Sequence, residues 1–62
     1  MDKVAFYTSR EFAEEAARSF KGPQIVDRIV DMLPNGDWIV GLIFSTGMFT
    51  IVTHAHIDRV VS

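Results

Sequence analysis

The chain has no cysteine among its 62 residues, so neither a disulfide nor a thiolate metal site can stabilise it. A domain of this length buries only about 60% of its unfolded surface and is marginally stable alone. Small scaffolds usually rely on disulfides, a metal ion or oligomerisation. Because disulfides are excluded, we expect either association with another chain or a metal site built from histidine and carboxylate.

A cluster of basic residues is also missing. The six lysine and arginine residues are scattered along the chain, and the formal net charge is −2. Nucleic-acid binding needs a basic stripe that neutralises phosphates, so we expect none. The N-terminal residues lack the basic patch and apolar run of a secretory signal. The sequence therefore predicts a cytoplasmic protein.

A long, uninterrupted apolar run is absent as well. The stretch from Trp38 to Ile57 carries no formal charge when its two histidines are neutral. A membrane-spanning helix needs about 20 mostly apolar residues. Glycine, serine and threonine interrupt this stretch, and the turn-like "STG" lies in its middle. We therefore expect two strands here, over residues 38–44 and 48–54, and no contact with a membrane.

Residues 8–22 show the pattern of an amphipathic helix. Thr8 and Glu11 fit a capping box, with Ser9 as an alternative cap. Gly22 and Pro23 end the pattern. Apolar residues recur at helical spacing and form one stripe, which we expect to include two phenylalanine core anchors. The stripe consists of Phe12, Ala13, Ala16, Ala17 and Phe20.

Residues 24–33 fit two structures. Apolar residues from Ile25 to Leu33 suit helical spacing, and in that case two helices would sandwich a hairpin. Asn35 and Gly36 follow, and Asn-Gly between apolar runs is a strong hairpin signal. Pro34 also favours an extended Leu33. We predict a strand.

The predicted fold is a single α+β domain over residues 1–62. The composition, 48% hydrophobic and 23% charged, excludes intrinsic disorder. A strand over Lys3–Tyr7 precedes the helix, and three strands follow, which gives the order β-α-β-β-β. We expect these three strands to form an antiparallel meander packed on the one helix. Residues 57–62 fit either a short strand or a helical turn.

Two-residue loops, at Asn35–Gly36 and Thr46–Gly47, would set the strand register. Directly opposed residues then share a face of the sheet. The first face would hold Leu33, Ile29, Trp38, Val40, Leu42, Phe44, Phe49 and Ile51, with Asp27 and Asp31. The second face would hold Val26, Val30, Met32, Ile39, Ile43, Met48 and Val52, with Arg28, Thr50 and His54.

Both faces are largely apolar, but one helix can cover only one of them. A bare second face would expose several hundred Å² of apolar surface, which monomers rarely tolerate. Covering 400 Å² would contribute about 10 kcal/mol before entropy costs. We therefore expect a homo-oligomer, with a further protein as partner. The predicted interface residues are Met32, Ile39, Ile43, Met48, Val52 and Trp38.

The stretch "THAHID" at residues 53–58 carries a histidine pair. Its His-x-His-x-Asp spacing resembles the opening of the metal-binding signature of metallo-β-lactamase-type hydrolases. That resemblance implies His54, His56 and Asp58 as ligands, but Arg59 stands where the signature has another histidine. On a strand, His54 and His56 would point the same way and could share a metal. The sequence thus predicts no catalytic site here and leaves a metal that assists assembly as an alternative.

No other constellation indicates an enzyme. The serines lack a nucleophile-elbow context and the glycines form no phosphate loop. On one strand, Asp27 and Asp31 would lie about 13 Å apart, too far for paired glycosidase carboxylates. We predict a cofactor-free accessory protein that binds, inhibits or regulates a protein partner. The alternative is an oligomer that binds a small molecule in a cleft between subunits, lined by Trp38, Phe44, Phe49 and Tyr7.

Overall fold

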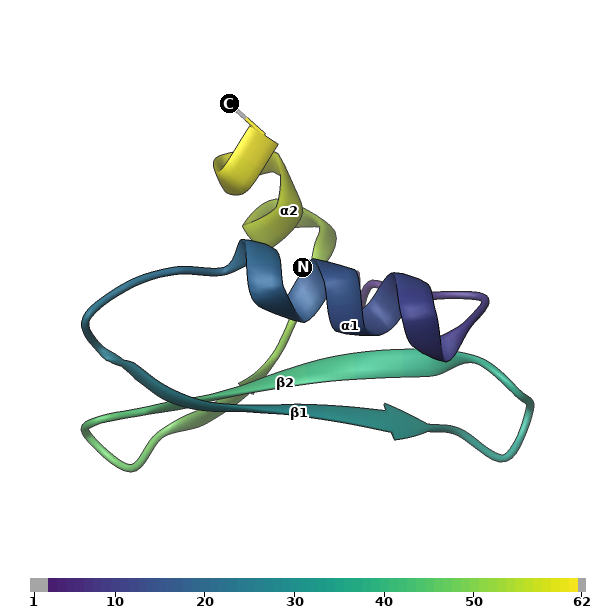
Figure 1. Ribbon diagram of the computed structural model, residues 1–62, viewed down its shortest axis with the longest axis horizontal. Coiled ribbons are helices and arrows are strands. Elements are labelled where there is room, and N and C mark those ends of the chain that lie inside the picture. The colour runs from purple at the N-terminus through teal and green to yellow at the C-terminus, as the bar shows by residue number, and fades with distance from the viewer. Residues whose placement is uncertain (1–2, 62) are drawn as a thin grey trace.

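The computed structural model describes residues 3–61, with side chains described as far as Ile57. The elements are α1 (Arg10–Ser19), β1 (Ile25–Met32), β2 (Trp38–Phe44), β3 (Phe49–Ile51) and α2 (His54–Val61). The strands form one antiparallel sheet in the order β1-β2-β3, and α1 packs along it (Figure 1). The α+β class, with a three-stranded antiparallel sheet and a packed helix, is confirmed, and residues 25–32 form a strand.

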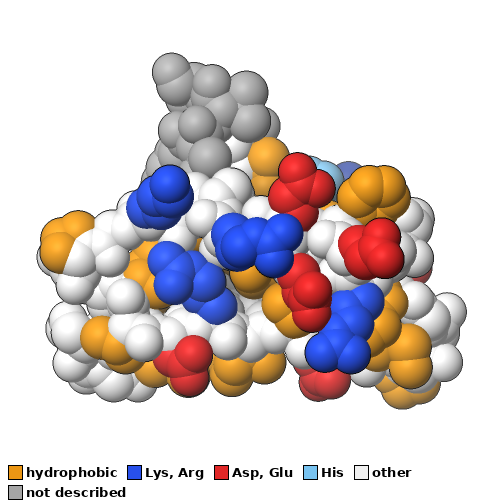
Figure 2. All heavy atoms as spheres, in the orientation of Figure 1, with side chains coloured by type: hydrophobic (Ala, Val, Ile, Leu, Met, Phe, Trp, Pro, Cys, Tyr) orange, Lys and Arg blue, Asp and Glu red, His pale blue; other side chains and the backbone are white. Residues whose placement is uncertain are grey.

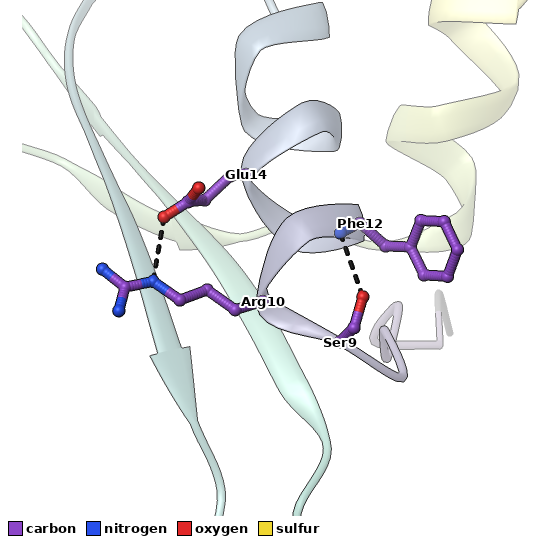
Figure 3. A network of polar contacts seen from close by, with 4 residues as sticks. All are labelled: Ser9, Arg10, Phe12 and Glu14. Atoms are coloured by element: carbon purple, nitrogen blue, oxygen red, sulfur yellow. Dashed lines mark hydrogen bonds and ion pairs between the residues drawn. The ribbon is translucent and has the colours of Figure 1, made fainter.

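Helix α1 begins after Ser9, whose Oγ accepts a hydrogen bond from the Phe12 amide at 3.2 Å (Figure 3). Ser9, rather than Thr8, is therefore the N-cap. Arg10 Nε donates to Glu14 Oε1 at 2.9 Å across the first turn. Figure 3 shows the Phe12 ring on the other side of the helix from this ion pair.

The face of α1 that packs on the sheet is built from small residues. Ala13 and Ala17 are buried there, and Phe20 is buried just past the end of the helix. Short side chains allow the helix to lie close to the strands. Phe12 is 59% exposed, so its prediction as a core anchor is wrong. Phe12 lies about 140° around the helix axis from Ala17.

The β1–β2 turn contains three loop residues instead of the predicted two. Leu33 N donates to Asp37 O at 2.7 Å, and Gly36 N donates to Leu33 O at 2.9 Å. Gly36 has φ +93°, a conformation that glycine adopts without strain. This is the pattern of a type I turn followed by a one-residue bulge. The two-residue loop predicted at Asn35–Gly36 is wrong.

The β2–β3 turn repeats the same arrangement. Phe44 N donates to Met48 O and Gly47 N donates to Phe44 O, both at 2.9 Å. Gly47 has φ +88°. The loop predicted at Thr46–Gly47 is therefore also one residue too short, and Phe44 lies opposite Met48 instead of Phe49.

These longer loops correct the predicted faces of the sheet. Val30 pairs with Val40, and Ile29 pairs with Gly41. Because side chains alternate along a strand, a one-residue shift moves every side chain of the partner strand to the other face. Ile29, Phe49 and Ile51 therefore lie on the face away from α1, whereas Val30 and Val52 lie beneath α1. The core consists of Ala5, Ala13, Ala17, Phe20, Val40, Leu42 and Val52.

Arg28 joins the sheet to the end of α1. Its guanidinium Nε donates to the carbonyl oxygen of Phe20 at 3.2 Å, and its Nη2 donates to the same oxygen. The last carbonyl groups of a helix lack partners within the helix. Arg28 thus satisfies a carbonyl at the helix C-terminus, where a positive charge is also favourable.

The strand predicted over Lys3–Tyr7 is present only as two isolated bridges. Val4 pairs with Thr53 and Tyr7 pairs with Trp38. Ala5, which is buried, donates its amide to Val52 O at 3.0 Å. The segment thus lies along the sheet past the end of β3 without forming a regular strand.

The chain after β3 turns into α2 rather than continuing as a strand to His54. Thr53 precedes this helix, and Ile57 N donates to Thr53 O at 3.2 Å. Helix α2 projects on the same side of the sheet as α1 (Figure 1). Within residues 3–61, neither helix has the length and apolar character that crossing a bilayer requires.

Candidate functional site

The face of the sheet away from α1 has no covering element. Both helices lie on the opposite side (Figure 1). Hydrophobic side chains follow the lower margin of the molecule in Figure 2, interrupted by a few acidic ones, while most charged side chains gather above them, over α1. We call this surface the open face. By the strand pairing it consists of Ile29, Ile39, Gly41, Ile43, Phe49 and Ile51, with Asp27 and Asp31 on β1.

Three cross-strand rows organise the open face. The central row runs Ile29, Gly41, Ile51, and the next row runs Asp27, Ile43, Phe49. The third row pairs Asp31 with Ile39. Side chains in such rows contact one another across the strands. The middle of the face is therefore uncharged, and its two carboxylates lie only along its β1 margin.

The aromatic ring of Phe49 lies across Gly41. A Cβ placed on Gly41 would come within 2.6 Å of Phe49 Cε2 and 2.8 Å of Cζ. Only a glycine lets the ring rest against the β2 backbone in this way. Phe49 nevertheless remains 54% exposed. The middle of the open face is thus a low aromatic surface, flanked by Ile29.

The accessible surface of the chain is large for its size. It amounts to 4598 Å², whereas a compact monomer of 7.0 kDa has about 4,000 Å². Phe49 and Ile29, which are 54% and 42% exposed on the open face, contribute to this excess. Among the described side chains, the large hydrophobic residues that are exposed are Phe6, Phe12, Val26, Ile29, Met32, Met48 and Phe49.

The structure separates the predicted interface residues into two groups. Ile39 and Ile43 lie on the open face, half-buried between neighbouring strands. Val52 has no exposed surface, and Trp38 packs against the core. Val52 therefore cannot contact a partner in this fold. The predicted face contained it because the assumed loop was one residue too short.

Met32 and Met48 also belong to the predicted interface. They lie opposite Trp38 and Phe44, on the side of the sheet that carries α1. Both are nevertheless well exposed, because each lies at an end of the sheet next to a turn. They are accessible, but they do not belong to the open face.

The histidine pair does not form the arrangement predicted for a strand. His54 and His56 lie in the first turn of α2, where residues two apart point about 160° away from each other. His56 Nδ1 accepts the Thr53 amide at 3.0 Å and lies 2.9 Å from Thr53 Oγ1. Asp58, the third predicted ligand, has a side chain outside the described residues.

His56 instead performs a structural role. A side-chain acceptor at the third helical position that binds the N-cap amide is one half of a capping box. The histidine spacing that resembles a hydrolase signature thus lies at the start of a helix.

The remaining chemistry is sparse. Burial raises the pKa of the Tyr7 phenol above its ordinary value. Over the part of the chain whose side chains are described, there is no group of three or more metal-binding side chains, and no pocket was found.

Sequence reasoning missed the role of Gly41. A glycine inside the apolar run "WIVGLIF" was the available signal, because an isolated strand glycine often marks the close approach of another group. It also missed that Phe6 and Phe12 are exposed on other parts of the surface.

Comparison with protein-family models, with curated proteins and with solved structures returned no match.

Proposed function

We propose that the chain is a small non-enzymatic interaction module that forms a homo-oligomer through the open face, with a symmetric dimer as the simplest form. One observation carries this proposal. A three-stranded sheet has both helices on one side, while Phe49 and Ile29 remain exposed in the uncharged middle of the other.

The size of the open face suits a second copy. At about 3.3 Å per residue, strands of 7 and 8 residues are about 25 Å long, and three strands span about 14 Å. Two such sheets can pack face to face, about 10 Å apart and nearly aligned, as in a β-sandwich. Pairing the open faces would bury about 350 Å² on each copy, which is less than a standard interface and typical of a weak, transient one. We therefore expect a concentration-dependent dimer.

The charge distribution also suits a second copy. Asp27 and Asp31 lie on β1, which is an outer strand of the sheet. A two-fold axis parallel to the strands places β1 of one copy over β3 of the other. The carboxylates then lie at opposite rims, away from each other and close to water. An uncharged centre with a polar rim is the usual anatomy of a protein interface.

In this dimer the two α1 helices lie on the outside. Their exposed surfaces, which carry Phe12 and the Arg10–Glu14 ion pair, stay available to a further protein. The regulatory or inhibitory role predicted from the sequence would use this outer surface.

Size-exclusion chromatography with light scattering tests the proposal by comparing the wild type with Phe49→Lys. We expect the wild type to shift from monomer to dimer as its concentration rises, and Phe49→Lys to remain monomeric with an unchanged circular dichroism spectrum. Phe12→Lys is the matched control, because Phe12 is equally exposed but lies on α1. We expect this variant to dimerise normally.

Two results would refute the proposal. One is a wild type that stays monomeric and folded at every concentration tested. The other is an equal loss of dimer in Phe49→Lys and Phe12→Lys. Native mass spectrometry of the same samples would reveal a bound small molecule, which would favour the alternative function.

A further inference from the structure

The outer edge of β1 is a second surface through which copies of this chain could associate. Met32 pairs with Trp38, and Trp38 exchanges both of its backbone hydrogen bonds with Tyr7, at 2.8 and 2.9 Å, on the far side of β2. The amide of Met32 therefore points away from β2. By the alternation of antiparallel pairs, the amides of Arg28 and Val30 point the same way.

Two of these three outward amides are already bonded within the chain. Asp27 Oδ1 accepts the Arg28 amide at 2.7 Å, and Asp31 Oδ1 accepts the Met32 amide at 2.9 Å. The carboxylate of each aspartate thus accepts a hydrogen bond from the backbone amide of the residue that follows it. Val30 follows Ile29, which has no acceptor to offer. An approaching strand would find one free donor between two carboxylates.

The same strand carries a β-bulge. The pairing shifts between Ile25 and Asp27, so Val26 is an extra residue on β1. Bulges and charged side chains are two ways in which proteins prevent an exposed strand edge from pairing with another chain. The opposite edge of the sheet is protected differently, because β3 has only three residues and Val52, just beyond it, bonds to Ala5.

We propose that Asp27 and Asp31 close the β1 edge to strand addition by a second copy of this chain. Their carboxylates occupy the amides that an added strand would need, and their charges repel the same carboxylates of another copy. Association would then be limited to the open face. Pairing at the β1 edge in addition would link open-face dimers into open-ended chains, because each dimer carries two such edges. The closed edge does not depend on whether the open face associates.

The test removes both carboxylates in a chain whose open face is disabled. Asp27→Ala with Asp31→Ala is made in the Phe49→Lys background and followed by sedimentation velocity. We expect the mass distribution to shift from monomer to dimer as concentration rises, because pairing at the β1 edge alone closes at two copies. Glu11→Ala with Glu15→Ala, in the same background, removes two negative charges from α1 and should leave the distribution unchanged.

The proposal is overturned if the aspartate variant keeps the mass distribution of its parent, or if the glutamate control assembles to the same extent. Amide hydrogen exchange on the wild type provides a second readout that needs no variant to fold. The proposal requires the Arg28 and Met32 amides to exchange more slowly than the Val30 amide, and equal exchange at all three would also overturn it. Neither readout depends on dimer formation through the open face. The failure of one proposal therefore leaves the other standing.

Discussion

The two faces of the sheet have similar compositions, but helices cover only one of them. Neighbouring residues of β2 show this directly: Leu42, beneath α1, is 2% exposed, whereas Ile43 points to the open face and is shielded only by adjacent strands. Both are large aliphatic residues in one apolar run. The burial of each is therefore decided by the elements packed on the sheet and not by its own hydrophobicity.

The small residues that allow close packing also serve different purposes on the two faces. On the covered face, Ala13 and Ala17 allow α1 to approach the strands closely. On the open face, Gly41 allows Phe49 of the same sheet to lie low over the backbone. The first arrangement completes the packing of a monomer. The second leaves a low, uncharged surface, which is what contact with another sheet requires.

The largest expected effect comes from the covered face. Leu42→Ala should destabilise the chain by about 2–5 kcal/mol, because it removes buried methyl groups and leaves a cavity. A chain of this length has a total stability of about 3–9 kcal/mol, so this variant should lose a large share of it and melt at a much lower temperature. Thermal unfolding followed by circular dichroism measures the effect. Ile43→Ala, at the next residue, should stay folded and weaken dimer formation. If Leu42→Ala and Ile43→Ala lowered the melting temperature equally, the distinction between the two faces would be contradicted.

A smaller effect is expected where Phe49 crosses Gly41. The added methyl group in Gly41→Ala must displace the ring, at a cost of about 1–2 kcal/mol, and should also weaken the dimer. Chemical denaturation measures the cost. In a Phe49→Leu background the same substitution should cost less, because no ring remains to be displaced. Identical costs in both backgrounds would show that the ring does not lie over Gly41 in solution.

Arg28 should contribute about 1 kcal/mol to the free energy of unfolding, through its hydrogen bonds to the Phe20 carbonyl at the end of α1. Arg28→Met keeps most of the aliphatic stem and removes the donors. We expect a lower midpoint in urea unfolding with an unchanged dimer mass. Arg28→Lys keeps one donor group and the charge, so its midpoint should fall less than that of Arg28→Met. An unchanged midpoint for Arg28→Met would show that this link between α1 and the sheet is not formed.

The smallest effect is expected at the start of α2. His56→Ala removes the acceptor of the Thr53 amide and should cost about 0.5 kcal/mol. His56→Gln keeps a side-chain acceptor suited to a capping box. Backbone chemical shifts of residues 54–57 should show lower helicity in the alanine variant and near wild-type helicity in the glutamine variant. Equal helicity in all three proteins would exclude the capping role.

Much of the architecture follows from local patterns. The bounds of β2 agree with the apolar run, and the alanine spacing predicts the buried side of α1. The strand at residues 25–32 follows from the turn signal after it. These elements are predictable because hydrophobic periodicity and glycine or proline punctuation act over a few residues.

The composition of the open face was predicted only in part, because the strand register depends on one residue in each turn. Asn35–Gly36 fits a two-residue loop, but Gly36 adopts the same positive φ range at the end of a three-residue loop. Pro34 was the deciding signal, because its fixed φ suits the second position of a type I turn. The strand predicted to continue to His54 ends earlier for a different reason. Thr53 begins a helix at a point where the apolar run suggests a continuing strand.

The most direct test of the account is an isotope-filtered nuclear Overhauser experiment on a mixture of ¹³C-labelled and unlabelled chains. Contacts between copies should join the ring of Phe49 to methyl groups of Ile29, Ile39, Ile43 and Ile51, all of which lie on the open face. The account would be contradicted if the mixed sample gave no contacts between copies at concentrations where the chain is folded, or if the contacts arose from Phe6 and Phe12 instead.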